Sequence, residues 1–418
     1  MLSLSPRRAC GGSWKPPEKG DSRASLARAV VTAEAVDATR LRPLLESRRV
    51  LLCVGCGGVG KTTTAAALAL AAARLGKRVL CLTIDPARRL AQSLGLEWAS
   101  TEARTVDPAL LAKVGVPEGG SLTIMRVDTK STFDGLIRQL APDVARRDRI
   151  LNNVLYRYIS TSLAGTQEYM AMEKLYELSD DARFDFILLD TPPTANALDF
   201  LDAPERLVGA IDSPAIRWFV QAFDDGSPGL KLNLVARSTA SLLRGLGRIT
   251  GGGFLEQVAA FVSEINAVFG GWRQRADQVS KALRGADVGY ILVTTPDPLA
   301  IREVAFFAER LKKEKMHADA FVVNRVHPPF PAESTETDAA LSTLGDGSDP
   351  TFAARCRAAL HDAARQGKLD KLHLLSLESA IEEAGAPAVL IPSFASDVYD
   401  LDALGEIAAI LAPPPKRD

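Results

Sequence analysis

A glycine-rich stretch at residues 55–63 has the residue types and spacing that bind phosphate groups. Gly55, Gly60, Lys61 and Thr62 satisfy the pattern G-x-x-x-x-G-K-[ST], in which a loop folds around phosphates with its backbone N–H groups pointing inward. Lys61 is expected to reach the β- and γ-phosphates of a nucleotide, and the Thr62 hydroxyl to bind Mg²⁺. The expected nucleotide contacts of this loop are Gly55, Cys56, Gly57, Gly58, Val59, Gly60, Lys61, Thr62 and Thr63.

Two aspartates each end an apolar run of the kind that forms a buried strand. Asp85 closes the run 77–85, and Asp190 closes the run 184–190. In open parallel sheets, ligands bind beyond the carboxyl ends of the strands. We interpret Asp190 as a metal ligand and Asp85 as the residue that orients the attacking water or the Mg²⁺ shell. The alternatives are that Asp85 merely caps a helix and that Asp190 and the residues after it form an ordinary strand-ending turn.

The chemistry that suits these residues is Mg²⁺-dependent ATP hydrolysis. Lys61 and Asp85 are the expected catalytic residues, and Thr62 and Asp190 are the expected metal ligands. A site of this kind accelerates phosphoryl transfer by positioning the reactants and neutralising charge. The cofactors predicted from the sequence are therefore ATP and Mg²⁺.

The elements that must position these residues alternate between strands and helices. The phosphate-binding stretch lies between an apolar strand and an alanine-rich helix, which is the context that this motif requires. Helical patterns follow most of the other strands, so we predict an α/β fold of the P-loop NTPase type, with a mostly parallel, doubly wound sheet of seven or eight strands. The clearest predicted strands are 50–54, 77–85, 121–127, 184–190, 288–294, 318–324 and 388–391.

Two regions between the strands are helical in pattern and form a predicted inserted subdomain, at about 130–180 and 198–287. The second region carries apolar stripes at helical spacing. One reading is a helical bundle that buries these stripes in itself; the other is a nucleotide-gated apolar groove for a client segment. The stripes comprise Phe254, Val258, Phe261, Ile265, Val268 and Trp272, then Ile216, Phe219, Val220 and Phe223, and finally Leu242, Leu243, Leu246 and Ile249.

Composition excludes several classes of partner. Lys and Arg total 50 against 51 Asp and Glu, a net charge of −1, so no global field attracts nucleic acid. The four histidines show no ligand spacing with one another or with cysteine pairs, and we expect no zinc site. Of the five cysteines, Cys53, Cys56 and Cys81 lie in or beside predicted buried strands, which is consistent with a reducing compartment.

The chain is expected to comprise a disordered leader at 1–40 and one ATPase domain at 41–418. No segment offers the roughly 18 uncharged apolar residues that a transmembrane helix needs. We therefore expect a cytoplasmic protein that can associate with a membrane peripherally.

These motifs together resemble the ArsA family of ATPases, which includes the arsenite-pump ATPase and the ATPase that delivers tail-anchored membrane proteins. The resemblance runs from about Val50 to the C-terminus. It rests on GCGGVGKTT at 55–63, Asp-Pro-Ala at 85–87, Asp-Thr-Pro-Pro-Thr at 190–194 and Val-Val-Asn-Arg at 322–325. It implies that Asp85 positions the attacking water and that Asp297 contacts the nucleotide. It also implies that Asn324 and the segment Pro392, Ser393 and Phe394 border the adenine base.

The chain departs from the family pattern at several positions. Cys56 stands where the family has a lysine that reaches across a dimer, and Arg88 and Arg89 follow Asp85 in place of a His-Ser pair. One arginine could replace the missing cation; the alternative is that both are solvated charges at a helix start. No C-x-x-C follows Asn324, so the zinc ligands of the targeting ATPases are absent from this sequence.

The resemblance implies a homodimer, or a heterodimer with a related ATPase, and a hydrophobic polypeptide client or membrane partner. We expect ATP hydrolysis to drive a conformational switch that binds or delivers this client. Two alternatives stay open. One is an ATP-binding chaperone, adaptor or partner subunit with little hydrolysis of its own, and the other is an anion (arsenite-type) transport ATPase subunit.

Overall fold

A computed structural model describes residues 41–84, 94, 102–154, 156–157, 160, 166–191, 202–206, 209, 253–328 and 350–413. The expected leader at 1–40 lies outside this set, as do the apolar stripes at 216–223 and 242–249. The following account concerns the described residues.

The sheet has eight strands in the order β3-β4-β2-β5-β1-β6-β7-β8, and all neighbours are parallel except β3 and β4. The mostly parallel sheet of seven or eight strands predicted from the sequence is therefore confirmed. The strands are β1 (Val50–Val54), β2 (Arg78–Thr83), β3 (Arg104–Thr105), β4 (Ser121–Arg126), β5 (Phe186–Asp190), β6 (Val288–Thr294), β7 (Ala320–Val326) and β8 (Ala388–Pro392).

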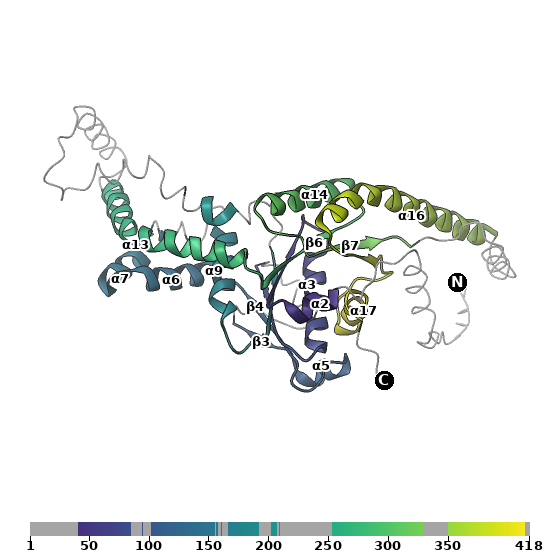
Figure 1. Cartoon of the computed structure of the whole chain (residues 1–418), viewed down its shortest axis with the longest axis horizontal. Helices are drawn as coiled ribbons and strands as arrows, with labels where there is room; N and C mark the ends of the chain where they lie inside the picture. Colours follow the sequence, from purple (N-terminus) through teal and green to yellow (C-terminus); the bar gives the residue numbers. More distant parts are fainter. Residues whose placement is uncertain are drawn as a thin grey trace, which may run out of the picture. The chain divides into compact units, whose positions relative to one another are not determined.

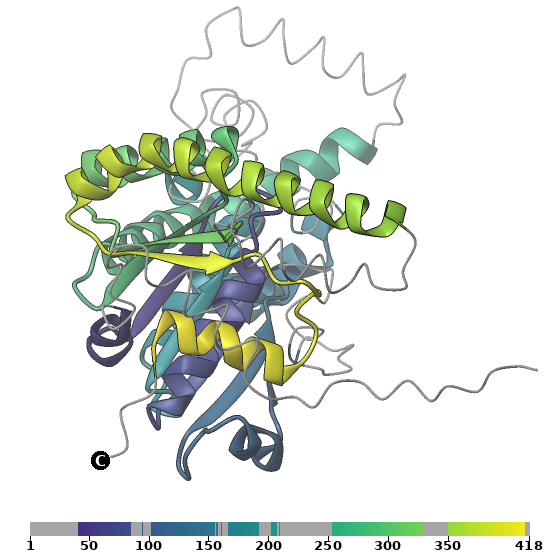
Figure 2. The ribbon, with the colours of Figure 1, turned by 90° about the vertical axis from the view of Figure 1, so that its right-hand side faces the viewer.

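Helices cover both faces of the sheet, which is why β1 and β5 are continuous apolar runs rather than alternating ones. Alternate residues of a strand enter different cores: Leu52 and Leu189 belong to one apolar cluster, and Leu51 and Leu188 to the other. Figures 1 and 2 show the two helical layers. One layer contains α2 (Leu41–Ser47), α3 (Lys61–Arg74), α5 (Pro108–Lys113) and α17 (Leu401–Leu411); the other includes α14 (Pro298–Lys313) and α16 (Pro350–Ala384).

Four further helices pack in the same apolar cluster as α14 and α16. They are α6 (Thr129–Leu140), α7 (Val144–Asn152), α9 (Thr166–Ser179) and α13 (Gly253–Leu283). Trp272 of α13 lies edge-on to Phe133 of α6, with ring centroids 5.0 Å apart. Arg275 of α13 donates to buried Glu173 of α9 at 2.7 Å. These helices therefore share one core with the sheet.

The described part of the apolar stripe on α13 faces this core. Phe261, Ile265, Val268 and Trp272 are buried, each at most 7% exposed. These residues behave as the bundle interpretation expects, so any open groove has to involve other parts of the helical regions. Among the described residues, no helix combines the length and apolar character needed to cross a membrane.

Candidate nucleotide-binding site

The phosphate-binding stretch connects β1, at the centre of the sheet, to the N-terminus of α3. Gly58 and Gly60 adopt left-handed backbone conformations, with φ of 82° and 93°. Residues with a Cβ rarely tolerate that region, so the glycines allow the loop to turn into the helix. Lys61 is the first residue of α3, and the free N–H groups of a helix start favour bound anions. Gly55 is buried beside the backbone of Val293.

Two side chains donate hydrogen bonds to backbone carbonyls of this loop. Lys61 Nζ donates to the Cys56 carbonyl oxygen at 2.7 Å. Asn324 Nδ2, from the end of β7, donates to the Val59 carbonyl oxygen at 2.9 Å. A Cβ at position 60 would lie 2.1 Å from the same Asn324 nitrogen, so the amide packs directly on the glycine. Asn324 therefore supports the phosphate-binding loop, a contact that the motif alone did not predict.

Asp190 ends β5 level with the start of the loop, because it pairs in register with Cys53 on β1 and Thr83 on β2. Its side chain is buried, with 1% of the residue exposed. Oδ2 accepts hydrogen bonds from the Thr62 hydroxyl at 2.8 Å and the Thr83 hydroxyl at 3.0 Å. The structure therefore brings together Thr62 and Asp190, the two predicted metal ligands.

The donor set fits Mg²⁺. A hydroxyl and a carboxylate are hard oxygen ligands, and Mg²⁺ is usually held by one or two such groups together with water and substrate phosphates. Thr62 and Asp190 would hold the ion. Thr83 was not predicted, although its position at the end of a strand beside the Asp190 strand is the signal that could have identified it.

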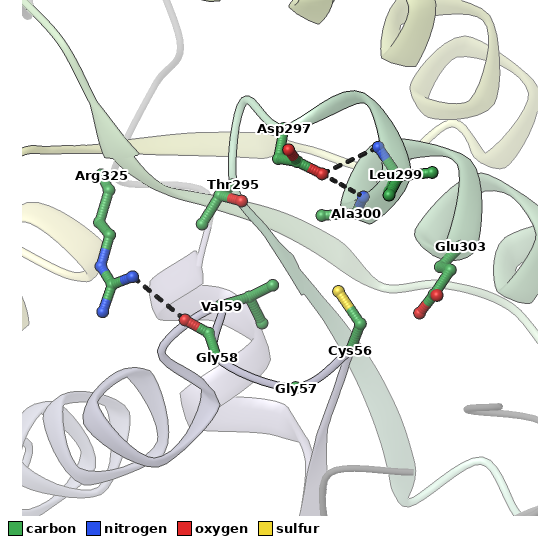
Figure 3. A pocket seen from close by; sticks show the side chains of 10 residues that line it. All are labelled: Cys56, Gly57, Gly58, Val59, Thr295, Asp297, Leu299, Ala300, Glu303 and Arg325. Atoms are coloured by element: carbon green, nitrogen blue, oxygen red, sulfur yellow. Dashed lines mark hydrogen bonds between the residues drawn. The ribbon is translucent and has the colours of Figure 1, made fainter. Parts of the chain in front are cut away.

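A cavity of about 360 Å³ opens beside the loop (Figure 3). Asp297 lines it and caps α14, where its Oδ1 accepts from the backbone N–H groups of Leu299 and Ala300. Burial raises the pKa of the Cys56 thiol above its ordinary value, and the nearby carboxylate of Glu303 adds to the rise. The lining residues are Cys56, Gly57, Gly58, Val59, Thr295, Asp297, Leu299, Ala300, Glu303 and Arg325.

The predicted adenine-binding residues lie at the ends of the next two strands. The backbone N–H of Ser393 donates to the Val326 carbonyl oxygen at 2.8 Å, which places the end of β8 beside the end of β7. Pro392, Ser393 and Phe394 do not line the cavity next to Cys56. Their contact with a base, and that of Asn324, stays a prediction.

The remaining predicted site residues lie outside the described part of the chain. These are Asp85, the arginines at 88 and 89, and residues 192–194 of the segment after Asp190. The role of Asp85 in positioning water stays a prediction. Thr191, the last described residue of that segment, donates its hydroxyl to the Cys53 carbonyl oxygen at 2.8 Å.

The chain is similar to known ATPases over most of its length. It matches the family model described as anion-transporting ATPase over residues 48–341. It is 26% identical over 319 residues to ATPase get3 of Aspergillus terreus, an alignment that covers 73% of this chain and 83% of that protein. It is 25% identical over 315 residues to ATPase GET3 of Paracoccidioides lutzii, with 74% and 82% covered.

Proposed function

The chain belongs to the ArsA family of anion-transporting ATPases, and from this premise we propose that its Mg²⁺-dependent ATP hydrolysis drives a conformational switch that binds or delivers a hydrophobic client or membrane partner. The chain is an ATPase by its family. The switch, the client and the dependence on Mg²⁺ are the proposed parts.

The observation that carries the proposal is the contact between Thr62 and Asp190. The Thr62 hydroxyl lies 2.8 Å from Asp190 Oδ2, so the phosphate-binding loop is joined to the strand whose carboxylate suits a metal ion. Bound Mg²⁺ supplies charge neutralisation at the β- and γ-phosphates. Lys61 leaves the Cys56 carbonyl to bind those phosphates, and Asp85 orients the water for attack on the γ-phosphate.

Strand β5 offers a physical route from the nucleotide to the helical region. Asp190 stands at its carboxyl end, and the chain enters its other end directly from α9. Arg49, immediately before β1, fixes that entry because its guanidinium donates to the carbonyl oxygens of Asp181 and Phe184, each at 3.1 Å. A shift of Asp190 toward a bound metal would therefore be transmitted to α9 and to α13, which packs on it.

Hydrogen exchange with and without Mg²⁺-ATP tests this coupling. We expect ATP to change the exchange of α13 (Gly253–Leu283), while α5 (Pro108–Lys113), which packs on β4 in the layer on the other face of the sheet, keeps its rate. Lys61→Ala, which cannot bind the phosphates, is expected to abolish the difference. Identical exchange of α13 in both conditions would favour a static bundle.

Client binding is tested with a variant that binds ATP without hydrolysing it. We expect Asp85→Asn plus ATP to retain a synthetic apolar helical peptide, and Lys61→Ala to release it. Sizing the protein with and without nucleotide tests the proposed dimer. Binding of ATP with no turnover would instead support the adaptor alternative.

A further inference from the structure

We propose that Arg325 is a positioning residue for ATP binding, because its guanidinium holds the Gly58 peptide of the phosphate-binding loop in the orientation that phosphates require. Arg325 Nη1 donates to the Gly58 carbonyl oxygen at 3.2 Å (Figure 3). The inference rests on ATP binding at this loop and not on the proposed client or switch.

The backbone conformation at Arg325 is unusual and directs this side chain toward the loop. Its φ is 60°, a left-handed conformation that a residue with a Cβ adopts only at a cost. The pairing of β7 with β8 is irregular between Val323 and Val326, which is where Arg325 lies. Such irregularities re-aim side chains next to functional sites. The neighbouring Asn324 stabilises the turn, since its Oδ1 accepts from the Arg325 N–H at 2.9 Å.

The contact acts through the geometry of the peptide unit. In a trans peptide the carbonyl and the following N–H point in opposite directions. Arg325 holds the Gly58 carbonyl and Asn324 holds the Val59 carbonyl, so the N–H groups of Val59 and Gly60 point away from these two side chains. Lys61 holds the Cys56 carbonyl, but must leave it to bind phosphate. Asn324 and Arg325 can keep their contacts when nucleotide binds.

The position of Arg325 also matters electrostatically. Asp297, at the start of α14, and Glu303, within it, line the same cavity as Arg325 (Figure 3). Two carboxylates beside a loop that binds a polyanion oppose that binding, and a nearby guanidinium offsets part of their field. Loss of Arg325 should therefore weaken ATP binding through both loop order and charge.

The test is calorimetric titration with a non-hydrolysable Mg²⁺-ATP analogue, alongside steady-state turnover and thermal unfolding. Arg325→Gly is the decisive variant because glycine accepts a φ of 60° without strain. We expect its Kd and its KM for ATP to rise about three- to tenfold, the effect of losing one hydrogen bond of ordinary net strength, because Arg325 is exposed to solvent. We expect kcat to change by less than about twofold, because the loop geometry is restored once ATP is bound. We expect Tm not to fall, because glycine accepts the φ of position 325 without strain.

Two variants complete the design. Lys315 is the other non-glycine residue with φ of 60° in the described chain, and it lies in the turn after α14. Lys315→Gly makes the same backbone change away from the loop and should leave ATP affinity unchanged. Arg325→Lys keeps a cationic donor and should recover most of the affinity.

The outcomes are separable. Wild-type affinity in Arg325→Gly, or a loss of affinity that comes with an equal loss in Lys315→Gly, overturns the proposal. A fall in Tm in Arg325→Gly that accounts for the weaker binding also overturns it, because the role is then structural. If the wild type itself binds no ATP, the assignment of the loop fails first, and that result is distinguishable from all the others.

Discussion

The ammonium group of Lys61 donates a hydrogen bond of 2.7 Å to the carbonyl oxygen of Cys56, five positions earlier in the same loop. Only 5% of Lys61 is exposed. A buried cation requires an anionic or dipolar partner, and the loop supplies one. When ATP binds, phosphate oxygens can replace this carbonyl, so the charge does not have to be exposed to water during the exchange.

Lys61→Ala should abolish measurable ATP turnover. Loss of a preorganised cation at the transferring phosphate costs on the order of 10²–10³ in rate or more. Steady-state phosphate release measures the effect. Lys77→Ala is the matched control, because Lys77 lies past the end of α3 and its Nζ contacts the Glu46 carbonyl. Turnover near the wild-type rate in Lys61→Ala would refute the site.

Asp190→Asn and Asp190→Ala should both lose Mg²⁺-dependent turnover but differ in stability. The alanine variant leaves the Thr62 and Thr83 hydroxyls without their acceptor, which costs about 1–3 kcal/mol of unfolding free energy. The asparagine variant keeps the volume and one acceptor oxygen, so urea unfolding should show a smaller loss. Equal Mg²⁺ titration curves for Asp190→Asn and the wild type would exclude Asp190 as a metal ligand.

Gly60→Ala should be more damaging than Gly58→Ala. Both substitutions place a Cβ in a left-handed conformation, at a cost of about 1–2 kcal/mol. At position 60 the new Cβ would also meet Asn324 Nδ2 at 2.1 Å, whereas nothing lies within 4 Å at position 58. Thermal unfolding and ATP titration of the pair should rank them in this order. A larger loss of stability in Gly58→Ala would contradict the geometry.

The ion pair between Asp185 and Arg78 should give a pH-dependent contribution to stability. Hydrogen bonds from Arg78 lower the pKa of Asp185 from 3.8 to about 2. Because the pKa of Asp185 is lower in the folded chain than in the unfolded chain, the ion pair stabilises the fold at pH values above the unfolded pKa of about 4. This contribution is lost as the pH falls from about 4 through 2.

A double-mutant cycle of Asp185→Asn and Arg78→Ala, followed by urea unfolding, isolates this contribution. The coupling should be modest because both side chains are more than a third exposed. It should be constant between pH 7 and 5 and smaller at pH 3. A coupling energy that increases as the pH falls would contradict this prediction.

Much of the fold could be predicted because the signals for its strands lie in short, continuous stretches of the sequence. The strands β1, β5, β6 and β8 are apolar runs bounded by turn residues, and a sheet covered on both faces requires such runs. Strand β3 was missed for the opposite reason. Arg104 and Thr105 are exposed and polar, and they pair with the edge of the sheet through tertiary contacts rather than through any apolar pattern.

The site was predicted less evenly than the fold. Lys61 and Thr62 could be identified because motif spacing fixes their places, and Asp190 because it ends an apolar strand. Thr83 was missed although it ends a predicted strand, because its place beside Asp190 depends on which strands become neighbours. Arg325 could not be identified, because its position depends on an irregularity in the pairing of β7 with β8. Nothing in the order of residues along the chain indicates that Arg325 reaches Gly58.

The central place of β1 in the sheet affects how the chain can fold during synthesis. Residues 50–54 pair with β5 at 187–190 and with β6 at 288–292, so both neighbours are made long after β1. At about 5–20 residues per second, a ribosome needs on the order of ten seconds or more to supply them. During that time an apolar strand with two unpaired edges is attached to the phosphate-binding loop. Nucleotide binding and the folding of the sheet core should therefore be late, linked events.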